Sequence, residues 1–446
     1  MIKNSIIHME CASIGANMEG VCRHEGQVVF VPGMLPGETG NVRIIKVQKH
    51  YCYGKLLELT NTSPCRQTTN CLHYPQCGGC SCRHIQYRDT LTYKQQQVQH
   101  CFSSIGHIPI ELPDIIGMDS PFHYRNKSSF PVSGTSDQPL IGFYAERSHR
   151  IIPTDHCVNA SDPSEKIIET IRRWITSYHI DPYQESDGSG FLRHIVIRTN
   201  TLGESLVTLV CTSDSLPAAD DLIRKLKALS VTSLVININN SPTNVILGRS
   251  YRTVYGSGTI AMQLGSLKFH ISSASFFQVN TIQTEKLYQK IIQYADLSEN
   301  DIALDVYCGV GTISLTMSQY CQHVYGIEIV PQAIENARLN AIKNGIDSVI
   351  FYQGAAEDVL PSFVHQHKDI SVIVVDPPRK GLDPIVIQSI CSTAADRLIY
   401  VSCNPATLAR DAALIIQQGY KLCHITCVDM FAWTSDVETI VLFKKI

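Results

Sequence analysis

The sequence predicts an α/β protein of three domains, in which a small β-barrel and an α+β domain precede a doubly wound, Rossmann-like domain. Short strand-like runs fill the first 60 residues, strands and helices mix irregularly from 120 to 265, and strands alternate regularly with helices after 266. A chain of 446 residues is also too long for one ordinary domain. We expect the barrel at 1–61, the α+β domain at 62–84 and 120–265, and the doubly wound domain at 85–119 and 266–446.

The composition is that of a globular protein, with 44% hydrophobic and 17% charged residues. No stretch reaches the length of a membrane span, and the opening MIKNSIIHMECAS lacks the basic-then-apolar order of a secretory signal. We therefore expect a soluble, cytoplasmic protein without a membrane partner, and a monomer. The formal net charge of -3 does not favour nucleic acid, so RNA binding would depend on local basic patches.

The first 60 residues contain the strand-like runs QVVFVPGMLPGETGNVRIIKV and YCYGKLLEL with no helix between them. Closely spaced strands of this kind predict a small barrel of the OB type, a fold that often binds RNA. Arg43, Lys46, Lys49 and His50 lie on or beside one of these strands. On charge alone, we favour an ordinary solvated face for them.

Seventeen cysteines are many for an intracellular protein, in which metal binding or catalysis is a more common use than disulfides. The densest cluster, SPCRQTTNCLHYPQCGGCSC, contains Cys71, Cys77 and Cys80 as C-x5-C-G-G-C. A fourth thiolate ligand would be Cys65, Cys82 or the more distant Cys157. Zinc sites usually contain two paired C-x2-C units, which this chain lacks, so we favour an iron-sulfur cluster over zinc. Chance clustering is the alternative.

Residues 85–105 space Leu91, Val98, Phe102 and Ile105 at helical intervals and predict an amphipathic helix. The following α+β region contains helical segments near 163–178 and 218–229. It also carries three basic clusters in or beside strands, where they would contact phosphates: Arg125 with Lys127, Arg147 with His149 and Arg150, and Arg193 with His194 and Arg198. Each cluster taken alone is also consistent with a solvated surface.

The C-terminal region opens with the strand, glycine turn and helix start IALDVYCGVGTISL. Gly309 and Gly311 allow a ligand to approach the backbone at the end of the first strand, and Glu328 ends the second strand, where an acid takes ribose hydroxyls. The full dinucleotide fingerprint is absent, and this layout suits S-adenosylmethionine. Glu357 or Asp358, after the third strand, would reach the adenine.

The fourth strand of this region ends in DPPR, residues 376–379. Methyltransferases that act on exocyclic amino groups have a related motif in which an aromatic residue takes the fourth position. Arg379 takes that position here, which argues against amino methylation. We expect Asp376 to accept a hydrogen bond from a ring N–H such as that of uracil; capping of a turn is the alternative role.

Cys403 lies in LIYVSCNPATLARD, between the strand that begins near Leu398 and a helix that begins at Pro405. There a helix N-terminus would stabilise a thiolate, although most free cysteines are simply packed. Carbon 5 of a pyrimidine becomes nucleophilic once a thiolate adds to carbon 6, and a base must later remove the carbon 5 proton. Glu438, at the start of the final strand, is our candidate base; an edge charge in water is its alternative role.

SCNPATLARD, DPPRKGLD, C-x5-C-G-G-C, SFFQVN and the closing Val-Glu resemble the RNA uracil-5 methyltransferase family, in particular its 23S ribosomal RNA members with an N-terminal TRAM domain. The resemblance covers nearly the whole chain and implies a class I methyltransferase fold. It implies that Cys403 is the nucleophile and Glu438 the general base, and that Cys71, Cys77, Cys80 and Cys157 hold a [4Fe-4S] cluster. It places S-adenosylmethionine against Gln278, Tyr307, Glu328 and Asp376, and the flipped uracil against Phe276.

The sequence departs from this family before the terminal Val-Glu, where Ala432, Trp433 and Asp436 replace a usual Pro-His pair and a second His. An extended segment would point Asp436 and Glu438 to the same face, and two nearby carboxylates raise the pKa of one of them. We expect 5-methyluridine formation in 23S ribosomal RNA, with Arg125, Lys127, Arg193, Phe276 and Gln278 contacting the RNA. The alternatives are a transfer RNA substrate, cytosine-5 methylation, and a binding or assembly factor without turnover.

Overall fold

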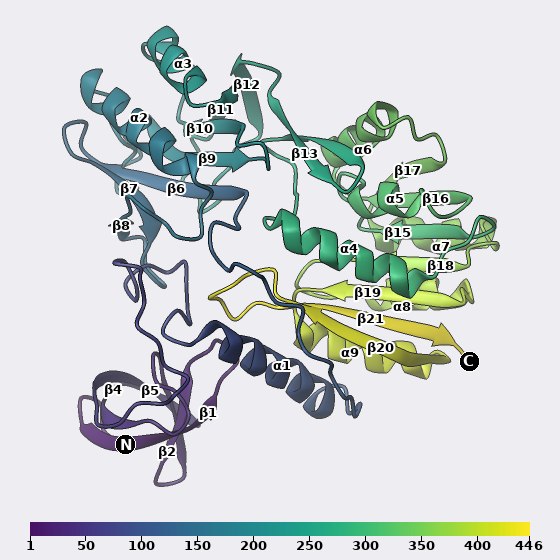
Figure 1. Cartoon of the computed structure of the whole chain (residues 1–446), viewed down its shortest axis with the longest axis horizontal. Coiled ribbons are helices and arrows are strands. Elements are labelled where there is room, and N and C mark those ends of the chain that lie inside the picture. Colours follow the sequence, from purple (N-terminus) through teal and green to yellow (C-terminus); the bar gives the residue numbers. More distant parts are fainter.

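The computed structural model describes residues 1–446 and begins with a closed five-stranded barrel (Figure 1). The strands are β1 (Ile6–Ile14), β2 (Gly20–His24), β3 (Gln27–Val31), β4 (Thr39–Val47) and β5 (Tyr51–Leu59), which close in the order β1-β2-β3-β5-β4. Alternate residues such as Val29, Val31 and Cys52 fill the barrel core. The predicted OB-like barrel is therefore confirmed.

The central part of the chain forms a seven-stranded sheet in the order β12-β11-β10-β9-β6-β7-β8. Its strands are β6 (Lys127–Gly134), β7 (Pro139–Tyr144), β8 (Ile151–Pro153), β9 (Leu192–Thr199), β10 (Ser205–Cys211), β11 (Val231–Ile238) and β12 (Ser250–Tyr255). Helices α2 (Pro163–Ser177) and α3 (Ala219–Lys227) pack on this sheet, because their apolar residues join one core with those of β9 to β11. Both helices lie where the sequence predicts them.

The C-terminal part forms a second seven-stranded sheet in the order β17-β16-β15-β18-β19-β21-β20. Its strands are β15 (Ile302–Val306), β16 (His323–Glu328), β17 (Val349–Gln353), β18 (Val372–Val375), β19 (Arg397–Ser402), β20 (Tyr420–Val428) and β21 (Glu438–Lys445). The first five of these are parallel, and β21 pairs antiparallel with both β19 and β20. A reversal of strand order at β15 makes a switch point at their carboxyl ends, where α/β sheets bind ligands.

Helices cover both faces of this sheet, and alternate strand residues separate two cores. One face packs on α4 (Thr281–Ala295), α5 (Thr312–Met317) and α6 (Pro331–Lys343). The other packs on α7 (Ala356–Gln366), α8 (Pro384–Ser392) and α9 (Pro405–Gln417). Ala303 thus belongs to the first core and Leu304 to the second. This fold is the predicted Rossmann-like class I methyltransferase fold.

Two further elements join the C-terminal layers. Helix α1 (Tyr87–Ser104) packs beside α9, with Val98 and Phe102 in the shared core. The prediction that Ile105 continues the apolar stripe of this helix is wrong. The helix ends before Ile105 and leaves its side chain 46% exposed. The hairpin of β13 (Thr259–Leu264) and β14 (Leu267–Ser272) contributes to the core under α4 to α6, and the domain boundary expected at 265 falls in its turn.

No helix of the structure combines the length and the apolar composition that crossing a bilayer requires.

Candidate active site

A cavity of about 650 Å³ opens at the carboxyl ends of the parallel strands. It brings together most of the residues that the sequence singles out in the C-terminal region. They come from every predicted motif there: Phe276, Gln278, Tyr307, Gly309, Glu328, Glu357, Asp376, Arg379, Cys403 and Glu438. The cavity is large enough for a nucleoside-containing ligand and lies where doubly wound sheets bind one.

Cys403 lies on the turn between β19 and α9, as the sequence predicts. The expectation that helix amides stabilise its thiolate is wrong, because the side chain of Asn404 accepts the first free amides of α9, those of Ala406 and Thr407. Burial and the carboxyl group of Glu438 raise the pKa of the thiol to about 11, although the cation of Arg379 opposes this rise. The thiol is therefore protonated in the substrate-free protein at neutral pH.

The two most specific sequence motifs hold each other in place. Asp411, the last residue of SCNPATLARD, is fully buried and accepts hydrogen bonds from the Leu382 amide at 2.8 Å and the Tyr400 hydroxyl at 2.7 Å. The Asn404 amide donates to the Arg379 carbonyl at 3.0 Å. These contacts fix the turn that carries Cys403 against the turn that follows Asp376.

Asp376 and Glu438 are the two carboxyl groups that line the cavity beside Cys403. Burial, together with nearby Asp305, raises the pKa of Asp376 to about 7. Glu438 is only 3% exposed, and burial, Asp376 and Asp436 together raise its pKa well above that of an ordinary glutamate. The alternative role of Glu438, an edge charge in water, is therefore excluded. A carboxyl group with a raised pKa in a cavity is suited to proton transfer.

Arg379 is the cation of this group. Its guanidinium lies 2.8 Å from the carboxylate of Asp436, in the loop before β21. Both Asp436 and Cys403 raise the pKa of Arg379, so the cation lies close to the thiol as well. Arg379 thus connects the turn after β18, the thiol and the loop that leads to Glu438. From the sequence, we noted of Arg379 only that it takes the position of an aromatic residue in a related motif.

The opposite end of the cavity is built by the glycine turn after β15. Gly309 has a φ of 55° and its amide donates to the Glu328 carboxylate at 3.1 Å; the amide of Val330 donates to the same carboxylate at 2.8 Å. Gly311 has a φ of 82°, and a Cβ there would lie 2.9 Å from the Phe351 ring. These glycines allow the chain to turn tightly and leave the carboxylate of Glu328 facing the cavity.

Phe276 and Gln278 enter the cavity from the loop between β14 and α4. Phe276 is 69% exposed, whereas Gln278 is buried. The side-chain amide of Asn126 donates to the Gln278 carbonyl at 2.9 Å and to the Thr281 hydroxyl at 3.0 Å. The loop is therefore fixed to the central sheet, and its exposed ring is available to a ligand.

A buried ion pair that the sequence analysis missed holds the start of the loop before Glu438. Lys94 of α1 lies 2.6 Å from Asp429, and neither side chain is exposed. Lys94 also donates to the Phe431 carbonyl at 3.0 Å, and the Tyr87 hydroxyl donates to Asp429 at 2.7 Å. Lys94 lies in line with Val98 and Phe102 on the apolar stripe of α1. A lysine at such a position is the sequence signal that predicts a buried partner.

Trp433, in the loop before Glu438, has a structural role. Trp433 is 2% exposed, its indole N–H donates to the Pro121 carbonyl at 2.9 Å, and the guanidinium of Arg83 lies 4.9 Å from its ring. The Trp433 carbonyl accepts the amides of Ser81 and Cys82. This tryptophan therefore joins the loop before Glu438 to the end of the cysteine-rich segment.

The cysteines of that segment divide into two groups. Cys71, Cys77, Cys80 and Cys157 line one small cavity, whereas Cys82 packs with Met18, Leu35 and Ile85 and Cys65 lies against that cluster. The Gly79 amide donates to the sulfur of Cys77, and the Asn159 amide donates to the sulfur of Cys80. No three His, Cys, Asp or Glu side chains of the structure converge as the ligands of one metal ion do.

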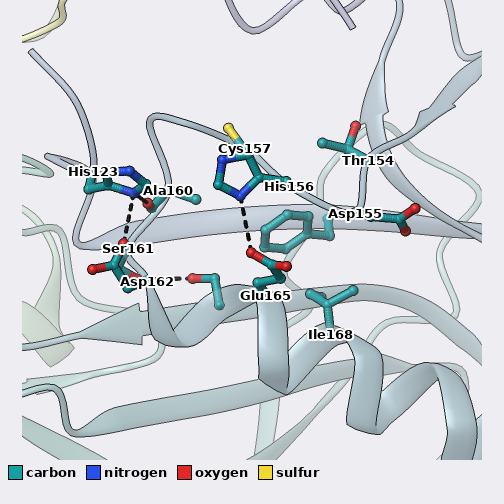
Figure 2. Close-up of a pocket in the computed structure, with 12 residues that line it drawn as sticks. His123, Thr154, Asp155, His156, Cys157, Ala160, Ser161, Asp162, Glu165 and Ile168 are labelled. Carbon is teal, nitrogen blue, oxygen red and sulfur yellow. Dashed lines mark hydrogen bonds and ion pairs between the residues drawn. The ribbon is translucent and has the colours of Figure 1, made fainter. Parts of the chain in front are cut away.

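A neighbouring pocket in the central domain contains two histidine-carboxylate pairs (Figure 2). His123 lies 2.9 Å from Asp162 and His156 lies 3.0 Å from Glu165, and both pairs are largely solvent-exposed. Asp155 adds a third carboxylate to the lining. An acidic rim of this kind does not suit a phosphate backbone.

The basic residues expected to contact RNA lie in different environments. The prediction that Arg193 contacts RNA is wrong. Its side chain is 5% exposed and donates to the carbonyls of Asn239 and Ser241 at 2.8 Å each. Arg125 lines the cysteine cavity rather than the one that holds Cys403. Lys127 lies opposite Arg198 across β6 and β9, and burial and this neighbour lower its pKa to about 8.

Comparison with known proteins agrees with this site. The tRNA (uracil-5-)-methyltransferase family model matches residues 86–446, and the TRAM domain model matches residues 12–57. An uncharacterized RNA methyltransferase of Clostridium acetobutylicum is 41% identical, with 100% of this chain and 98% of that protein covered. An uncharacterized RNA methyltransferase of Halalkalibacterium halodurans is 40% identical, and the match covers 99% of this chain and 97% of that protein.

Among solved structures, the Pyrococcus abyssi tRNA (uracil-54, C5)-methyltransferase in complex with S-adenosyl-L-homocysteine superposes with a TM-score of 0.80. It is 26% identical, and the match covers 98% of this chain and 99% of that chain. The fold and the cavity define a class I, S-adenosylmethionine-dependent methyltransferase. The chain belongs to the tRNA (uracil-5-)-methyltransferase family and is an RNA (uracil-5) methyltransferase.

Proposed function

We propose that this protein makes 5-methyluridine in 23S ribosomal RNA through a covalent adduct between Cys403 and carbon 6 of the target uracil. The observation that carries the mechanism is the convergence of a thiol, two carboxyl groups with raised pKa values and an exposed aromatic ring on one cavity. The resemblance to TRAM-containing 23S enzymes supports the substrate.

In the first step the Cys403 thiol releases its proton to solvent and its sulfur forms a bond to carbon 6. The electrons of the C5=C6 double bond then shift onto the carbon 4 carbonyl as an enolate. Asp376, whose pKa lies near 7, donates to or accepts from the ring edge and holds the base in this orientation. Phe276 stacks on the base after it leaves its RNA helix.

S-adenosylmethionine supplies the methyl group on a cationic sulfonium, and its positive charge favours ionisation of nearby carboxyl groups. Glu328, Gln278, Tyr307 and the turn at Gly309 and Gly311 would hold it. After carbon 5 has taken the methyl group, the Glu438 carboxylate removes the carbon 5 proton. The C5=C6 double bond then reforms, the bond from carbon 6 to sulfur breaks, and Cys403 leaves as a thiolate. The thiolate then takes a proton back from solvent, so the overall reaction releases one proton, the one from carbon 5.

We also propose that Cys71, Cys77, Cys80 and Cys157 hold a [4Fe-4S] cluster. Four sulfurs that line one cavity, two of which accept N–H hydrogen bonds, fit thiolate ligation. A four-iron cluster takes one thiolate at each iron, whereas a single zinc ion draws all four to one point. Their position in the central domain suits a structural role.

A transfer RNA substrate is the second candidate, because the superposed Pyrococcus abyssi enzyme acts on tRNA. Methyl transfer from labelled S-adenosylmethionine to 23S ribosomal RNA and to bulk tRNA, each prepared without 5-methyluridine, separates the two. We expect label in 5-methyluridine of the ribosomal RNA alone. Label in the tRNA alone would replace our substrate, label in 5-methylcytidine would replace the uracil reaction, and no label in either RNA would favour a binding or assembly factor.

A further inference from the structure

Trp433 is held in an unfavourable backbone conformation by contacts from outside its own loop. Its φ is 66°, in the left-handed region that bulky side chains rarely occupy. Its carbonyl accepts the amides of Ser81 at 2.9 Å and Cys82 at 3.2 Å, and its indole N–H donates to the Pro121 carbonyl. A residue keeps such a conformation only where its surroundings impose it. The conformation of Trp433 therefore depends on the order of the cysteine-rich segment.

A chain of contacts runs from the cysteines to the Trp433 ring. It starts at the four-cysteine cavity, which is lined by Cys71, Cys77, Cys80 and Cys157. The side-chain amide of Asn159 donates to the Cys80 sulfur at 3.3 Å, and its oxygen accepts a hydrogen bond from Arg83 at 3.1 Å. The Arg83 guanidinium lies 4.9 Å from the centroid of the Trp433 ring. Asn159 and Arg83 therefore connect a proposed cluster ligand to the loop before Glu438.

The charge of Arg83 favours an anionic group in the four-cysteine cavity. Its side chain is 1% exposed, its hydrogen-bond partners Asn70 and Asn159 are neutral, and its Nε has no partner. A buried cation is costly unless negative charge lies close to it. Thiolates that hold a cluster place negative charge on the far side of Asn159. Loss of the cluster should therefore leave the charge of Arg83 uncompensated and weaken its hold on Trp433.

Hydrogen bonds link Trp433 to the start of β21. The Cys82 thiol donates to the Thr434 carbonyl at 3.6 Å, and the Asp436 amide donates to the Thr434 hydroxyl at 3.3 Å. Glu438 follows as the first residue of β21. A displacement of 1 Å in a reacting group costs about 100-fold in rate. A change at Trp433 therefore reaches Glu438 over a short, hydrogen-bonded segment, at a scale that matters for proton removal.

We propose that Arg83 and Trp433 are positioning residues that couple the four-cysteine cavity to the general base Glu438. With the cluster bound, Arg83 fixes the Trp433 ring, and the Glu438 carboxylate can reach the carbon 5 proton. Without the cluster, Trp433 relaxes out of its left-handed conformation and Glu438 is displaced. Addition of Cys403 and methyl transfer precede the step that uses Glu438, so the coupling acts on product release. This inference rests on the proposed mechanism and the proposed cluster.

The first test compares methyl transfer with product release. In Trp433→Ala, a single turnover should place the labelled methyl group on the RNA at the wild-type rate. Release of free methylated RNA should be at least about tenfold slower, so that a labelled protein-RNA adduct accumulates on denaturing gels. Trp433→Phe keeps a ring beside Arg83 and should restore most of the release rate. Trp174→Phe, the same change in a core tryptophan of α2, is the matched control and should release product normally.

Tryptophan fluorescence tests the coupling without measuring activity. The chain contains two tryptophans, so Trp174→Phe leaves Trp433 as the only one that emits. In this background, Cys77→Ser should lose the cluster and shift the emission maximum toward that of the unfolded protein, because the Trp433 ring enters water. Cys65→Ser should leave the maximum unchanged. Arg83→Gln should shift it even with iron retained, and circular dichroism of each variant checks that the sheets are folded.

The two measurements separate this inference from the proposals on which it rests. Unchanged emission in Cys77→Ser, or product release at the wild-type rate in folded Trp433→Ala, would overturn the coupling alone if the wild type contains iron and methylates RNA. The expected emission shifts in a protein that methylates no RNA would contradict the proposed reaction alone. A wild type that methylates RNA but contains no iron would contradict the cluster and the coupling together.

Discussion

The guanidinium of Arg379 lies 2.8 Å from the carboxylate of Asp436, although the two residues are 57 positions apart in the chain. Arg379 follows β18, the strand that ends next to Asp376, and Asp436 belongs to the loop that leads to Glu438. The ion pair therefore fixes the loop that leads to Glu438 and keeps a cation close to Cys403.

Replacement of Arg379 by a neutral residue should slow the reaction, because it makes the Cys403 thiol harder to ionise. Arg379 opposes the rise in the pKa of Cys403, so Arg379→Gln should raise this pKa further and lower kcat/KM at pH 8 roughly tenfold. The thiolate is the reactive form and exists above the pKa. The kcat/KM of the wild type should therefore increase with pH beyond 9, and the profile of the variant should move to higher pH. Lys368→Gln, an exposed substitution in another turn, should change neither. An unshifted profile in Arg379→Gln would show that the pair does not act on the thiol.

Glu438→Gln should separate methyl transfer from product release. The amide cannot remove the carbon 5 proton, so turnover should fall by about 10² to 10⁴ while a methylated RNA remains attached to Cys403. Denaturing gel electrophoresis with labelled S-adenosylmethionine should detect this labelled protein-RNA adduct on ordinary RNA. Free methylated RNA released at the wild-type rate would assign the proton to another base.

The buried pair of Lys94 and Asp429 should matter for stability. Lys94→Met leaves Asp429 buried without its cation, and the free energy of unfolding in urea should fall by about 3–5 kcal/mol. In Lys94→Met/Asp429→Asn the loss should be smaller, because the amide is neutral and still accepts the Tyr87 hydrogen bond. Lys286→Ala removes the pair with the exposed Asp119, in which Lys286 is half-buried, and should cost less than about 1 kcal/mol. A double variant no more stable than Lys94→Met would exclude an uncompensated charge as the cause.

The proposed cluster makes a prediction about which cysteines matter. Protein purified anaerobically should contain iron and inorganic sulfide, and Cys77→Ser should lose both. Cys65→Ser is the matched control, since Cys65 lies in the same segment but outside the cavity of the four thiols, and it should keep the metal content. Stoichiometric zinc in place of iron, or equal losses in the two variants, would contradict the assignment of these four ligands.

The elements that carry the site follow from local patterns, which explains why the sequence predicts them. The apolar runs that end at Val306, Val375 and Ser402 are buried parallel strands, and parallel strands bring their carboxyl ends to one edge of a sheet. Cys403, Asp376 and the glycine turn therefore meet in one cavity, as expected.

The contacts that set the electrostatics of the site depend on tertiary packing, which local patterns do not contain. Lys94 and Asp429 are 335 positions apart, and only the packing of α1 against the C-terminal domain brings them together. Asn404 takes the helix amides that we assigned to the thiolate, because its own cap geometry satisfies them locally. Arg193 reads as an exposed cation in sequence but is buried by the loop whose carbonyls it binds.

The most direct test of the central claim replaces the carbon 5 hydrogen of the target uridine by fluorine. Glu438 then has no proton to remove, so the RNA should remain covalently attached to the protein after it has received the labelled methyl group. We expect this adduct with the wild type and none with Cys403→Ala, while Cys308→Ala, which removes another thiol from the cavity lining, should still form it. An adduct that forms in Cys403→Ala would contradict the account.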